Sequence, residues 1–287
     1  MKFFSKYRVR ILQFLNHFIF IDNYSISYYF SRFGNNLQQI AVGILYSQRI
    51  SGNFYVQKHP LVKNFSIINN QIANYFFVLK KHYRFFYFKE KKDFPKSIDA
   101  SYIENNIEDT FKSYLRPNIP FLKELQIPED TLVIHIRSGD IFYKPILSYF
   151  QNPINYYKTL IQNYEKVILV TSAEKNNPVV RELLKETKVT IHSTTLQEDF
   201  NILFNAINLA TSGVGTFPIA AALLSNKLRN FYYTDLYSDE HLNPKMVTNK
   251  RVNHFKYKVE EGYKEKYLSE EKIDKLILND CINVDKL

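Results

Sequence analysis

The sequence predicts an α/β protein built from two Rossmann-type lobes with a cleft between them. From residue 131 onwards, short β-rich apolar runs alternate with helical stretches. That order is typical of parallel strands joined by right-handed helical crossovers. The front of the chain shows the same order once, with a strand expected at 24–30, a helix around 37–45 and a strand at 53–57. Five of only seven glycines also fall at, or just inside, the expected strand-to-helix turns.

The second half of the chain carries the clearer pattern. Strands are predicted at 132–136, 167–170, 188–192, 209–211 and 230–233, the last of which closes the series. Helices are predicted near 155–164, 178–186, 196–208 and 217–224. This series predicts one Rossmann-like layer of parallel strands and helices.

Two segments break the alternation in the front half. Residues 80–95 are basic and aromatic and are expected to form a surface insertion. Residues 93–130 contain several prolines and acidic residues, so we place the boundary between the lobes within them. The predicted domains are 1–125 and 126–287.

Composition and charge limit the function. The single cysteine, Cys281, can form neither an internal disulfide nor a cysteine metal cluster, which favours a reducing compartment. The net charge is +10, but residues 1–96 hold 15 Lys and Arg against 3 Asp and Glu, whereas the remainder holds 23 against 25. A basic first third suits anionic lipid, nucleic acid or a phosphorylated substrate, or it serves only as a solubilising face.

The first 21 residues begin basic and turn apolar, but they are not typical of a signal peptide. Gln13, Asn16 and His17 interrupt the apolar part, and no small-residue cleavage site follows. No segment offers the roughly 20 apolar residues that cross a bilayer. Apolar residues at helical spacing between 11 and 18 indicate either an amphipathic helix lying on a membrane or an ordinary first helix packed on the domain.

The first glycine-bearing motif is Ser-Arg-Phe-Gly-Asn-Asn-Leu-Gln-Gln at 31–39. It joins an expected strand to an expected helix, and Asn35 or Asn36 can cap that helix. A helix that begins at the carboxyl end of a strand lies where open α/β sheets bind ligands. A capped turn without a ligand is the alternative.

The second motif is His-Ile-Arg-Ser-Gly-Asp at 135–140. Strand alternation places His135 and Arg137 on one face, at the carboxyl end of the strand. A guanidinium at that position is well suited to grip phosphate through two parallel hydrogen bonds. Asp140 could orient Arg137, cap the next segment or act on substrate. The alternative is an internal Arg137–Asp140 pair that only braces the turn.

The third motif runs from 195 to 225. Thr195 and Glu198 form a capping box, and Asp199 lies at the edge of the apolar stripe of the helix. The turn Ser-Gly-Val-Gly-Thr-Phe at 212–217 then leads into Pro218 and an Ala-rich helix. Backbone N–H groups at such a helix N-terminus form an anion site, unless the turn is only a tight crossover.

Several other site types are missing from the sequence. No Asp-x-Asp triplet, Walker phosphate loop or Gly-x-Gly-x-x-Gly fingerprint is present. No His/Cys cluster has metal-ligand spacing, and no Gly-x-Ser-x-Gly elbow occurs. These absences lower the expectation of ATP, NAD, metal-dependent and α/β-hydrolase chemistry.

The three motifs together resemble the fucosyltransferase superfamily, which includes bacterial α-1,2-fucosyltransferases (glycosyltransferase family 11), α-1,6-fucosyltransferases and protein O-fucosyltransferases. His135 to Asp140 matches the superfamily's His-x-Arg-x-Gly-Asp signature in every fixed position. Residues 32–36 resemble its Gly-Asn-Gln/Asn motif, with Ser31 where glycine is frequent. Asp199 and the Gly215-Thr216-Phe217 turn resemble its third motif, with Gly213 and Gly215 where serine is frequent.

This resemblance implies a GT-B-like fold, with a basic acceptor-side lobe and a second lobe that binds nucleotide-sugar. It implies that Arg137 holds the β-phosphate of a GDP-sugar and that Asn35 reaches the diphosphate or acceptor across the cleft. The nucleotide site would include His135, Gly139, Asp199, Ser212, Gly215, Thr216 and Phe217. It implies no cofactor and no essential metal, and it leaves the catalytic base unassigned.

The expected function is therefore inverting, metal-independent transfer of fucose, or a related sugar, from a GDP-sugar to a glycan acceptor. We expect an acceptor in bacterial surface polysaccharide or lipooligosaccharide synthesis, either free or carried on lipid. We expect a cytoplasmic protein in peripheral contact with the anionic inner face of the membrane. Two alternatives stay open: a catalytically inactive relative that binds nucleotide or glycan, and a nucleic-acid-binding protein based on the basic, aromatic 80–96 segment. No known nucleic-acid-binding motif supports the latter.

Overall fold

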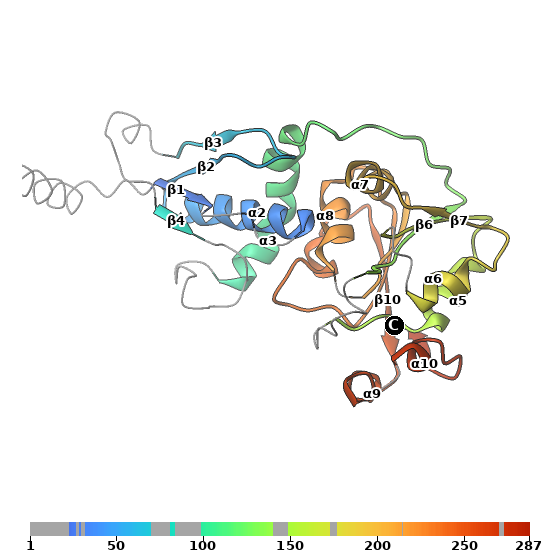
Figure 1. Cartoon of the computed structure of the whole chain (residues 1–287). Helices are drawn as coiled ribbons and strands as arrows, with labels where there is room; N and C mark the ends of the chain where they lie inside the picture. The colour runs from blue at the N-terminus through green and yellow to red at the C-terminus, as the bar shows by residue number, and fades with distance from the viewer. Residues whose placement is uncertain are drawn as a thin grey trace, which may run out of the picture.

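The chain forms two β-sheets with helices packed between and around them (Figure 1). The structure is a computed structural model, and it describes residues 23–26, 29, 32–69, 81–83, 99–139, 149–172, 177–213, 215–269 and 273–287. One sheet lies in each half of the chain, so the predicted α/β class is confirmed. The amphipathic segment predicted at residues 1–21 lies outside the described residues.

The first sheet is small and has the strand order β3-β2-β1-β4. β1 lies parallel to β2 and β4, and β3 runs antiparallel to β2 at one edge. The surface insertion predicted for residues 80–95 is wrong at Lys81–Tyr83, because these residues form a strand beside β1; residues 84–95 lie outside the described residues. The strands are β1 (Asn23–Ile26), β2 (Asn53–Val56), β3 (Phe65–Ile67) and β4 (Lys81–Tyr83).

Helix α2 (Phe33–Arg49) joins β1 to β2 and is buried along most of its length. Every residue from Phe33 to Ser47 is buried, which is typical of a helix inside a core rather than on a surface. The helix packs against the first sheet on one side and against α3 and α8 on the other (Figure 1). Gly43 allows the ring of Phe54 from β2 to lie directly against the helix backbone.

The segment predicted to hold the domain boundary is largely helical. Helix α3 (Ala100–Thr110) begins at Asp99, whose carboxylate accepts a hydrogen bond from the Tyr102 backbone N–H at 2.7 Å. A π-helical turn, η2 (Phe111–Leu115), and a 3-10 turn, η3 (Arg116–Asn118), continue it. Its buried residues recur every four positions and pack toward α2, and they are Ile103, Ile107, Phe111 and Leu115.

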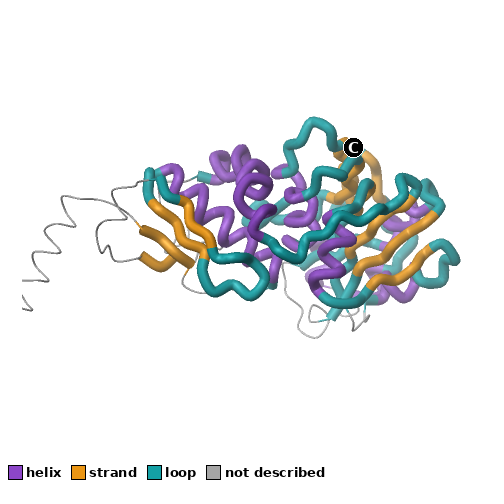
Figure 2. The backbone as a smooth tube through the Cα atoms, turned by 90° about the horizontal axis from the view of Figure 1, so that it is seen from above, coloured by secondary structure: helices purple, strands orange, loops and turns teal. Residues whose placement is uncertain are grey.

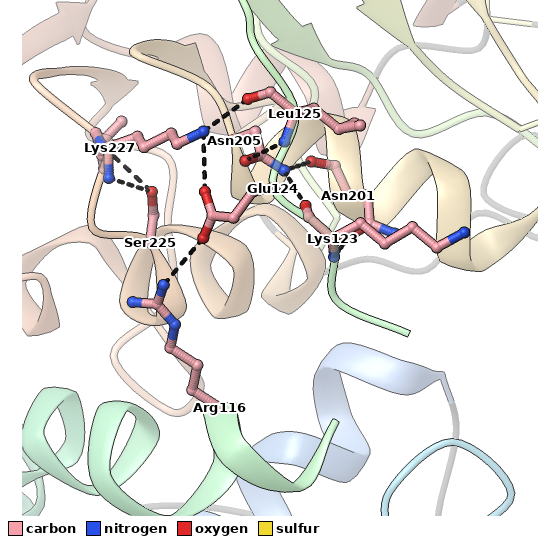
Figure 3. Close-up of polar contacts among 9 residues, drawn as sticks. Arg116, Lys123, Glu124, Leu125, Asn201, Asn205, Ser225 and Lys227 are labelled. Carbon is pink, nitrogen blue, oxygen red and sulfur yellow. Dashed lines mark hydrogen bonds and ion pairs between the residues drawn. The ribbon is translucent and has the colours of Figure 1, made fainter. Parts of the chain in front are cut away.

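Residues 119–130 then cross to the second sheet, held by two buried asparagines one helical turn apart (Figure 3). Asn201 lies on α7 (Leu196–Phe204), and Asn205 is the C-cap of that helix. Asn201 Oδ1 accepts from the Lys123 backbone N–H at 2.9 Å, and Asn205 Oδ1 accepts from the Leu125 backbone N–H at 2.9 Å. Asn205 Nδ2 donates to the Lys123 carbonyl at 2.7 Å. These amides satisfy the backbone of a segment that belongs to no sheet or helix.

Exposed charges flank the same crossover. The Glu124 carboxylate lies 2.9 Å from Lys227 Nζ and 3.3 Å from Arg116 (Figure 3). Ion pairs to an exposed carboxylate such as that of Glu124 contribute little. Lys227 Nζ also donates a hydrogen bond to the Leu125 carbonyl at 2.7 Å, so this lysine fastens the crossover through the backbone as well.

The second sheet has the order β11-β10-β9-β8-β5-β6-β7, and every neighbouring pair is parallel except β10 with β11. The prediction that the series closes at 230–233 is therefore wrong, because two more strands follow. The strands are β5 (Thr131–His135), β6 (Lys166–Val170), β7 (Val189–His192), β8 (Asn208–Ala210), β9 (Asn230–Thr234), β10 (Asn253–Val259) and β11 (Val284–Lys286). The α-helices are α5 (Ile154–Ile161), α6 (Pro178–Leu183), α7 (Leu196–Phe204), α8 (Thr216–Leu224), α9 (Tyr263–Ser269) and α10 (Ile273–Ile277), and a 3-10 turn is η4 (Pro244–Met246).

Helix α7 ends four residues before the predicted 196–208 helix does. The cause is Asn208, which begins β8 instead of ending the helix. Its side-chain amide donates to the Glu129 carbonyl at 2.8 Å and to the Thr131 carbonyl at 3.0 Å. These bonds fasten the start of β8 beside β5.

The two sheets share one apolar core. A single cluster of buried side chains includes residues of α2, α3, η2, α7 and α8 and extends to strands of both sheets. Figure 2 shows these helices between the two groups of strands. A second cluster fills the opposite face of the second sheet, beneath α5, α6, α9 and α10. The first cluster therefore joins the two halves of the chain by apolar packing. The carboxyl ends of the strands lie outside this packing and are available for a site.

Candidate functional site

Each sheet has a topological switch point. In the second sheet the chain moves from β5 to β6 and β7 on one side and then returns to β8 on the other. In the first sheet β1 likewise lies between β2 and β4. Open α/β sheets bind ligands at the carboxyl ends of the strands at such points. The first motif follows β1, the second begins at the end of β5, and the 212–217 turn of the third follows β8, so these turns lie at the switch points. The start of the third motif, with Asp199, instead follows β7 at the edge of the second sheet.

The first turns of α2 and α8 touch each other. Thr216 Oγ1 donates a hydrogen bond to Asn35 Oδ1 at 2.6 Å. A Cβ on Gly34 would lie 2.7 Å from the backbone N of Phe217 and from Thr216 Oγ1, so only glycine permits this approach. The first and third motifs, about 180 residues apart in the chain, therefore meet at one point.

A cavity of about 580 Å³ opens beside this contact, and residues following strands of both sheets line it. The predicted two-lobed arrangement with a cleft is therefore confirmed, and this volume suits a ligand of nucleotide size. The predicted site residues that line the cavity are Asn35, His135, Arg137, Asp199, Thr216 and Phe217. Three lining residues that the sequence did not assign to the site are Arg32, His59 and Tyr149.

Arg137 lies just beyond the end of β5, with its guanidinium over an aromatic ring. The Arg137 Cζ lies 4.3 Å from the centroid of the Tyr149 ring. Stacking orients a guanidinium while its in-plane N–H groups stay directed away from the ring. The Arg137 carbonyl accepts a hydrogen bond from Asn177 Nδ2 at 2.9 Å, and Asn177 also caps α6. The turn that carries Arg137 is therefore tied to its neighbours.

The end of the second motif forms a tight turn. Ser138 Oγ lies 2.9 Å from Thr171 Oγ1, and Gly139 has a φ of 83°, a left-handed conformation that favours glycine. Gly139 therefore shapes the backbone rather than the cavity wall. Asp140 lies outside the described residues, and so does its expected pairing with Arg137.

His135 is a neutral group on the cavity wall. Burial, together with the positive charges of Arg137 and Arg32, lowers the pKa of His135 from 6.5 to about 3. Its Nδ1 lies 3.4 Å from Ser212 Oγ, which follows β8, and its ring is 5.6 Å from that of Phe217. Ser212 is buried and supports His135 from behind rather than lining the cavity.

His59 lines the cavity from the first sheet. The Leu61 backbone N–H donates to Nδ1 at 3.0 Å, so the proton is on Nε2, which donates to Asn36 Oδ1 at 3.1 Å. Burial lowers the pKa of His59 to about 4. Both ring nitrogens are therefore engaged, and His59 serves to position Asn36. Its place two residues after the predicted strand 53–57 is the signal that could have identified it.

The Asp199 side chain places a carboxylate on the cavity wall. Asp199 Oδ1 accepts from the backbone N–H and the hydroxyl of Thr194, at 3.1 and 3.2 Å, and lies 3.6 Å from His192 Nε2. Burial raises the pKa of Asp199 above its ordinary value. The predicted capping box of Thr195 with Glu198 is confirmed, and it fixes the start of the helix that carries Asp199.

One local prediction at the helix starts is wrong. The N-cap of α2 is Arg32, and Asn35 and Asn36 lie inside the first turn, where their amides bond Thr216 and His59 instead of the helix end. Gly215, the N-cap of α8, has an extended backbone and no heavy atom within 4 Å of an added Cβ, so the fold alone does not require glycine there. Gly215 lines a smaller hollow on the other side of Asn35 and Thr216.

Among the described residues, no group of three or more His, Cys, Asp or Glu side chains is arranged to hold a metal ion. Across the same described part of the chain, none of the helices has both the length and the apolar character that a membrane span requires.

Comparisons with known proteins add a distant likeness. No family model and no curated protein matches the chain. Among solved structures, the chain is similar to the crystal structure of POFUT1 in complex with GDP, with a TM-score of 0.39 and 12% sequence identity. The match covers 74% of this chain and 98% of that chain. The function proposed below therefore rests on the residues of the cavity itself.

Proposed function

We propose that the chain is a glycosyltransferase that transfers fucose, or a related sugar, from a GDP-sugar to a glycan acceptor. The observation that supports this most strongly is the convergence of Arg137, Arg32 and the first turn of α8 on one nucleotide-sized cavity. Guanidinium groups and a helix N-terminus are the features that bind diphosphate without a metal. The two-lobed arrangement would then be that of a GT-B-like enzyme, divided near residues 125 and 126.

Asp199 favours guanine as the base of the donor. A carboxylate only accepts hydrogen bonds, and guanine presents two adjacent donors, N1–H and the N2 amino group. Uracil and adenine lack that pair. Because Asp199 is half-buried, a base that left the carboxylate unpaired would be penalised more strongly than at an exposed site. Leu196 and Phe217 supply apolar surface in the same cavity.

Arg137 would provide the main catalytic contribution. Transfer of a glycosyl group builds negative charge on the departing diphosphate, and a preorganised cation beside that charge lowers the barrier. The Tyr149 ring and the Asn177 hydrogen bond hold Arg137 in place before substrate arrives. An acceptor hydroxyl would attack the anomeric carbon from the side opposite the β-phosphate, and the bond from that carbon to the β-phosphate oxygen would break with inversion of configuration. The hydroxyl proton would pass to a base that is not assigned among the described residues.

Asn35 would contact the donor or acceptor through its amide nitrogen. Its Oδ1 already accepts the Thr216 hydroxyl proton, and no bond from Nδ2 is found among the described residues. The Nδ2 protons are therefore the groups that Asn35 offers to a ligand. Asp140 remains the proposed second carboxylate of the site. Gly139, Ser212 and Gly215 also stay proposed nucleotide-site residues, although none of the three lines the cavity.

Substitution of Arg137 tests the proposal. We expect Arg137→Ala to lose nearly all transfer from GDP-fucose, measured as GDP released with a glycan acceptor in EDTA buffer, while its unfolding midpoint stays within the range of wild type. Arg251→Ala removes the same side chain at an exposed position and should transfer normally. Turnover like that of wild type in a folded Arg137→Ala protein would reject the proposal.

The acceptor is proposed to be a bacterial surface glycan precursor on or near an anionic membrane. The support is the excess of Lys and Arg in residues 1–96. Removal of residues 1–10 should weaken sedimentation with vesicles rich in anionic lipid. Unchanged sedimentation would contradict the membrane contact without affecting the donor assignment, and nucleic acid is not an expected partner.

A further inference from the structure

The segment between β7 and α7 holds Asp199 by one oxygen of its carboxylate. Asp199 lies in the first turn of α7, and its Oδ1 accepts from the Thr194 backbone N–H at 3.1 Å and from the Thr194 hydroxyl at 3.2 Å. Two donors fill the two acceptor positions of a carboxylate oxygen. No hydrogen bond to Oδ2 is found among the described residues, so Oδ2 is the atom that Asp199 offers to the cavity it lines.

The direction of these bonds follows from counting protons. Thr194 Oγ1 also lies 3.2 Å from Nε2 of His192, the last residue of β7. A hydroxyl has one proton and an ionised carboxylate only accepts, so the Thr194 proton is directed to Asp199. His192 Nε2 must then carry a proton and donate it to Thr194 Oγ1. A series of hydrogen bonds therefore runs from His192 through Thr194 to Asp199.

The backbone fixes both ends of this series. The Thr171 backbone N–H donates to the His192 carbonyl at 3.3 Å, next to the end of β6. The Asp199 backbone N–H donates to the Thr195 carbonyl at 2.9 Å, at the start of α7. The side chains of His192 and Asp199 thus start from fixed positions, and the Thr194 hydroxyl lies between them.

The same bonds oppose the effect of burial on the carboxylate. Burial raises the pKa of Asp199, and the negative charge of Glu198 acts in the same direction. The hydrogen bonds from Thr194 and a positive charge on His192 lower that pKa. The series therefore favours the ionised form of Asp199, which is the form that accepts from the N–H donors of a base.

We propose that His192 and Thr194 are positioning residues, which hold Asp199 Oδ1 and so present Oδ2 to the base of the bound nucleotide. Thr194 lines the cavity, but the three sequence motifs include neither residue. This inference rests on the proposed function for the identity of the base. The hold on the carboxylate can be measured without any ligand.

The first test is calorimetric titration of the full chain with GDP and with inorganic pyrophosphate, which has no base. We expect Thr194→Val to weaken GDP binding about threefold to tenfold, the scale of one hydrogen bond, and pyrophosphate binding less than about twofold. Thr194→Ser restores the hydroxyl and should bind GDP within about twofold of wild type. Thr190→Val is the matched control, because the exposed Thr190 of β7 bonds only the Val167 carbonyl, and neither affinity should change by more than about twofold.

Substitution of His192 tests the direction of the series. His192→Phe keeps a ring but removes the donor, so it should weaken GDP binding. In the Thr194→Val background the same change should add less than about twofold, because His192 acts through the hydroxyl. His192→Gln keeps an N–H donor and should recover part of the affinity. Additive losses in the double variant would contradict the series.

The second test is titration of the Asp199 carboxyl carbon by NMR in the free protein. Thr194→Val should raise the pKa of Asp199, because a hydrogen bond to its ionised form is lost, whereas Thr194→Ser should leave it as in wild type. An unchanged pKa in Thr194→Val would show that the hydroxyl does not hold the carboxylate.

The outcomes separate this inference from the proposed function. If Asp199→Asn loses GDP binding but Thr194→Val weakens it no more than Thr190→Val, the positioning role is wrong and the donor assignment stands. If Asp199→Asn binds GDP as wild type does, Asp199 does not contact the base and the positioning role is wrong. If wild type binds no GDP, the donor assignment fails together with the role in base recognition, and the carboxyl titration decides whether Thr194 holds Asp199. Should Thr194→Val fail to fold by urea unfolding, the two His192 variants decide.

Discussion

The two strand-to-helix turns that meet at the cavity use glycine for different reasons. In the first turn, Gly34 is needed by the facing helix, because a side chain there would strike the backbone of Thr216 and Phe217. In the second turn, Gly213 has a φ of 91° and lies against the Phe150 carbonyl, whereas Gly215 has open space around it. A scarce glycine beside the cavity can thus serve packing or backbone conformation, and of these three only Gly215 is required by neither.

Of the glycine substitutions in these two turns, Gly34→Ala should lower the stability most. The new Cβ would meet backbone atoms at 2.7 Å, and these can yield only if α8 moves away from α2. Overpacking of a buried contact of this kind costs about 3 kcal/mol. The expected result is a lower urea unfolding midpoint together with loss of GDP binding in calorimetry. A Gly34→Ala protein as stable as wild type would show that the helices do not meet as described.

Acidification should lower the free energy of unfolding through both turns, because each turn packs against a neutral histidine. The pKa of His59 is lowered to about 4 and that of His135 to about 3. Between these lowered pKa values and the ordinary value of 6.5, the unfolded chain therefore binds more protons than the folded chain. The stability linked to both groups is complete above pH 6.5 and is lost as the pH falls toward 4, on the order of 2 kcal/mol for each at pH 5.

Urea unfolding between pH 5 and 8 measures this loss. The histidine signals of the folded protein, followed by NMR, supply the control, since neither His59 nor His135 should titrate above pH 5. A normal titration of His135 near pH 6.5 would contradict its burial close to the positive charges of Arg137 and Arg32.

Gly213→Ala should destabilise less than Gly34→Ala. A left-handed conformation costs a non-glycine residue roughly 1–2 kcal/mol, and the added Cβ would also lie 2.7 Å from the Phe150 carbonyl oxygen. Gly262→Ala is the matched control, because Gly262 has a similar φ of 81° with no neighbour within 4 Å of the Cβ. The difference between the two unfolding free energies measures the contacts of the added Cβ with the Phe150 carbonyl and with Asn152 Oδ1, which would lie 3.0 Å away. Equal losses would show that these contacts add nothing.

Gly215→Ala should have the smallest effect on stability. Its backbone is extended, and open space receives the Cβ, so the loss should stay below about 1 kcal/mol, the scale of an N-cap change. GDP binding should weaken about threefold to tenfold, if the N–H groups at this helix start contact the diphosphate. A large loss of stability would show that Gly215 serves the fold as Gly34 does.

The sequence predicts most of the second sheet because its central strands leave continuous apolar runs. Residues 132–136 and 167–170 match β5 and β6 within one residue, as expected for strands buried on both faces. β10 lacks a continuous apolar run, but lysines alternate with aromatic residues along Asn253–Val259, a period-2 pattern of a half-exposed strand that could have identified it. β4 was missed because three residues are too few to show any period.

For the candidate site, the sequence locates the turns but not how they meet. Arg137 and His135 could be predicted because they share one face at the end of one strand. The roles of Asn35 and Asn36 could not, since their amides bond Thr216 and His59, partners set by tertiary packing. The same holds for Tyr149, whose contact with Arg137 joins segments on either side of residues 140–148.

The central claim is that the cavity between the two sheets binds a GDP-sugar, and a thermal-shift panel tests it most directly. GDP, UDP, CMP and ADP are compared, each with magnesium and with EDTA. A ligand that binds the folded state must raise the melting temperature by mass action. The proposal predicts stabilisation by GDP alone, equal in EDTA and abolished in Arg137→Ala. Stabilisation by another nucleotide instead, or none by GDP at millimolar concentration, would contradict it.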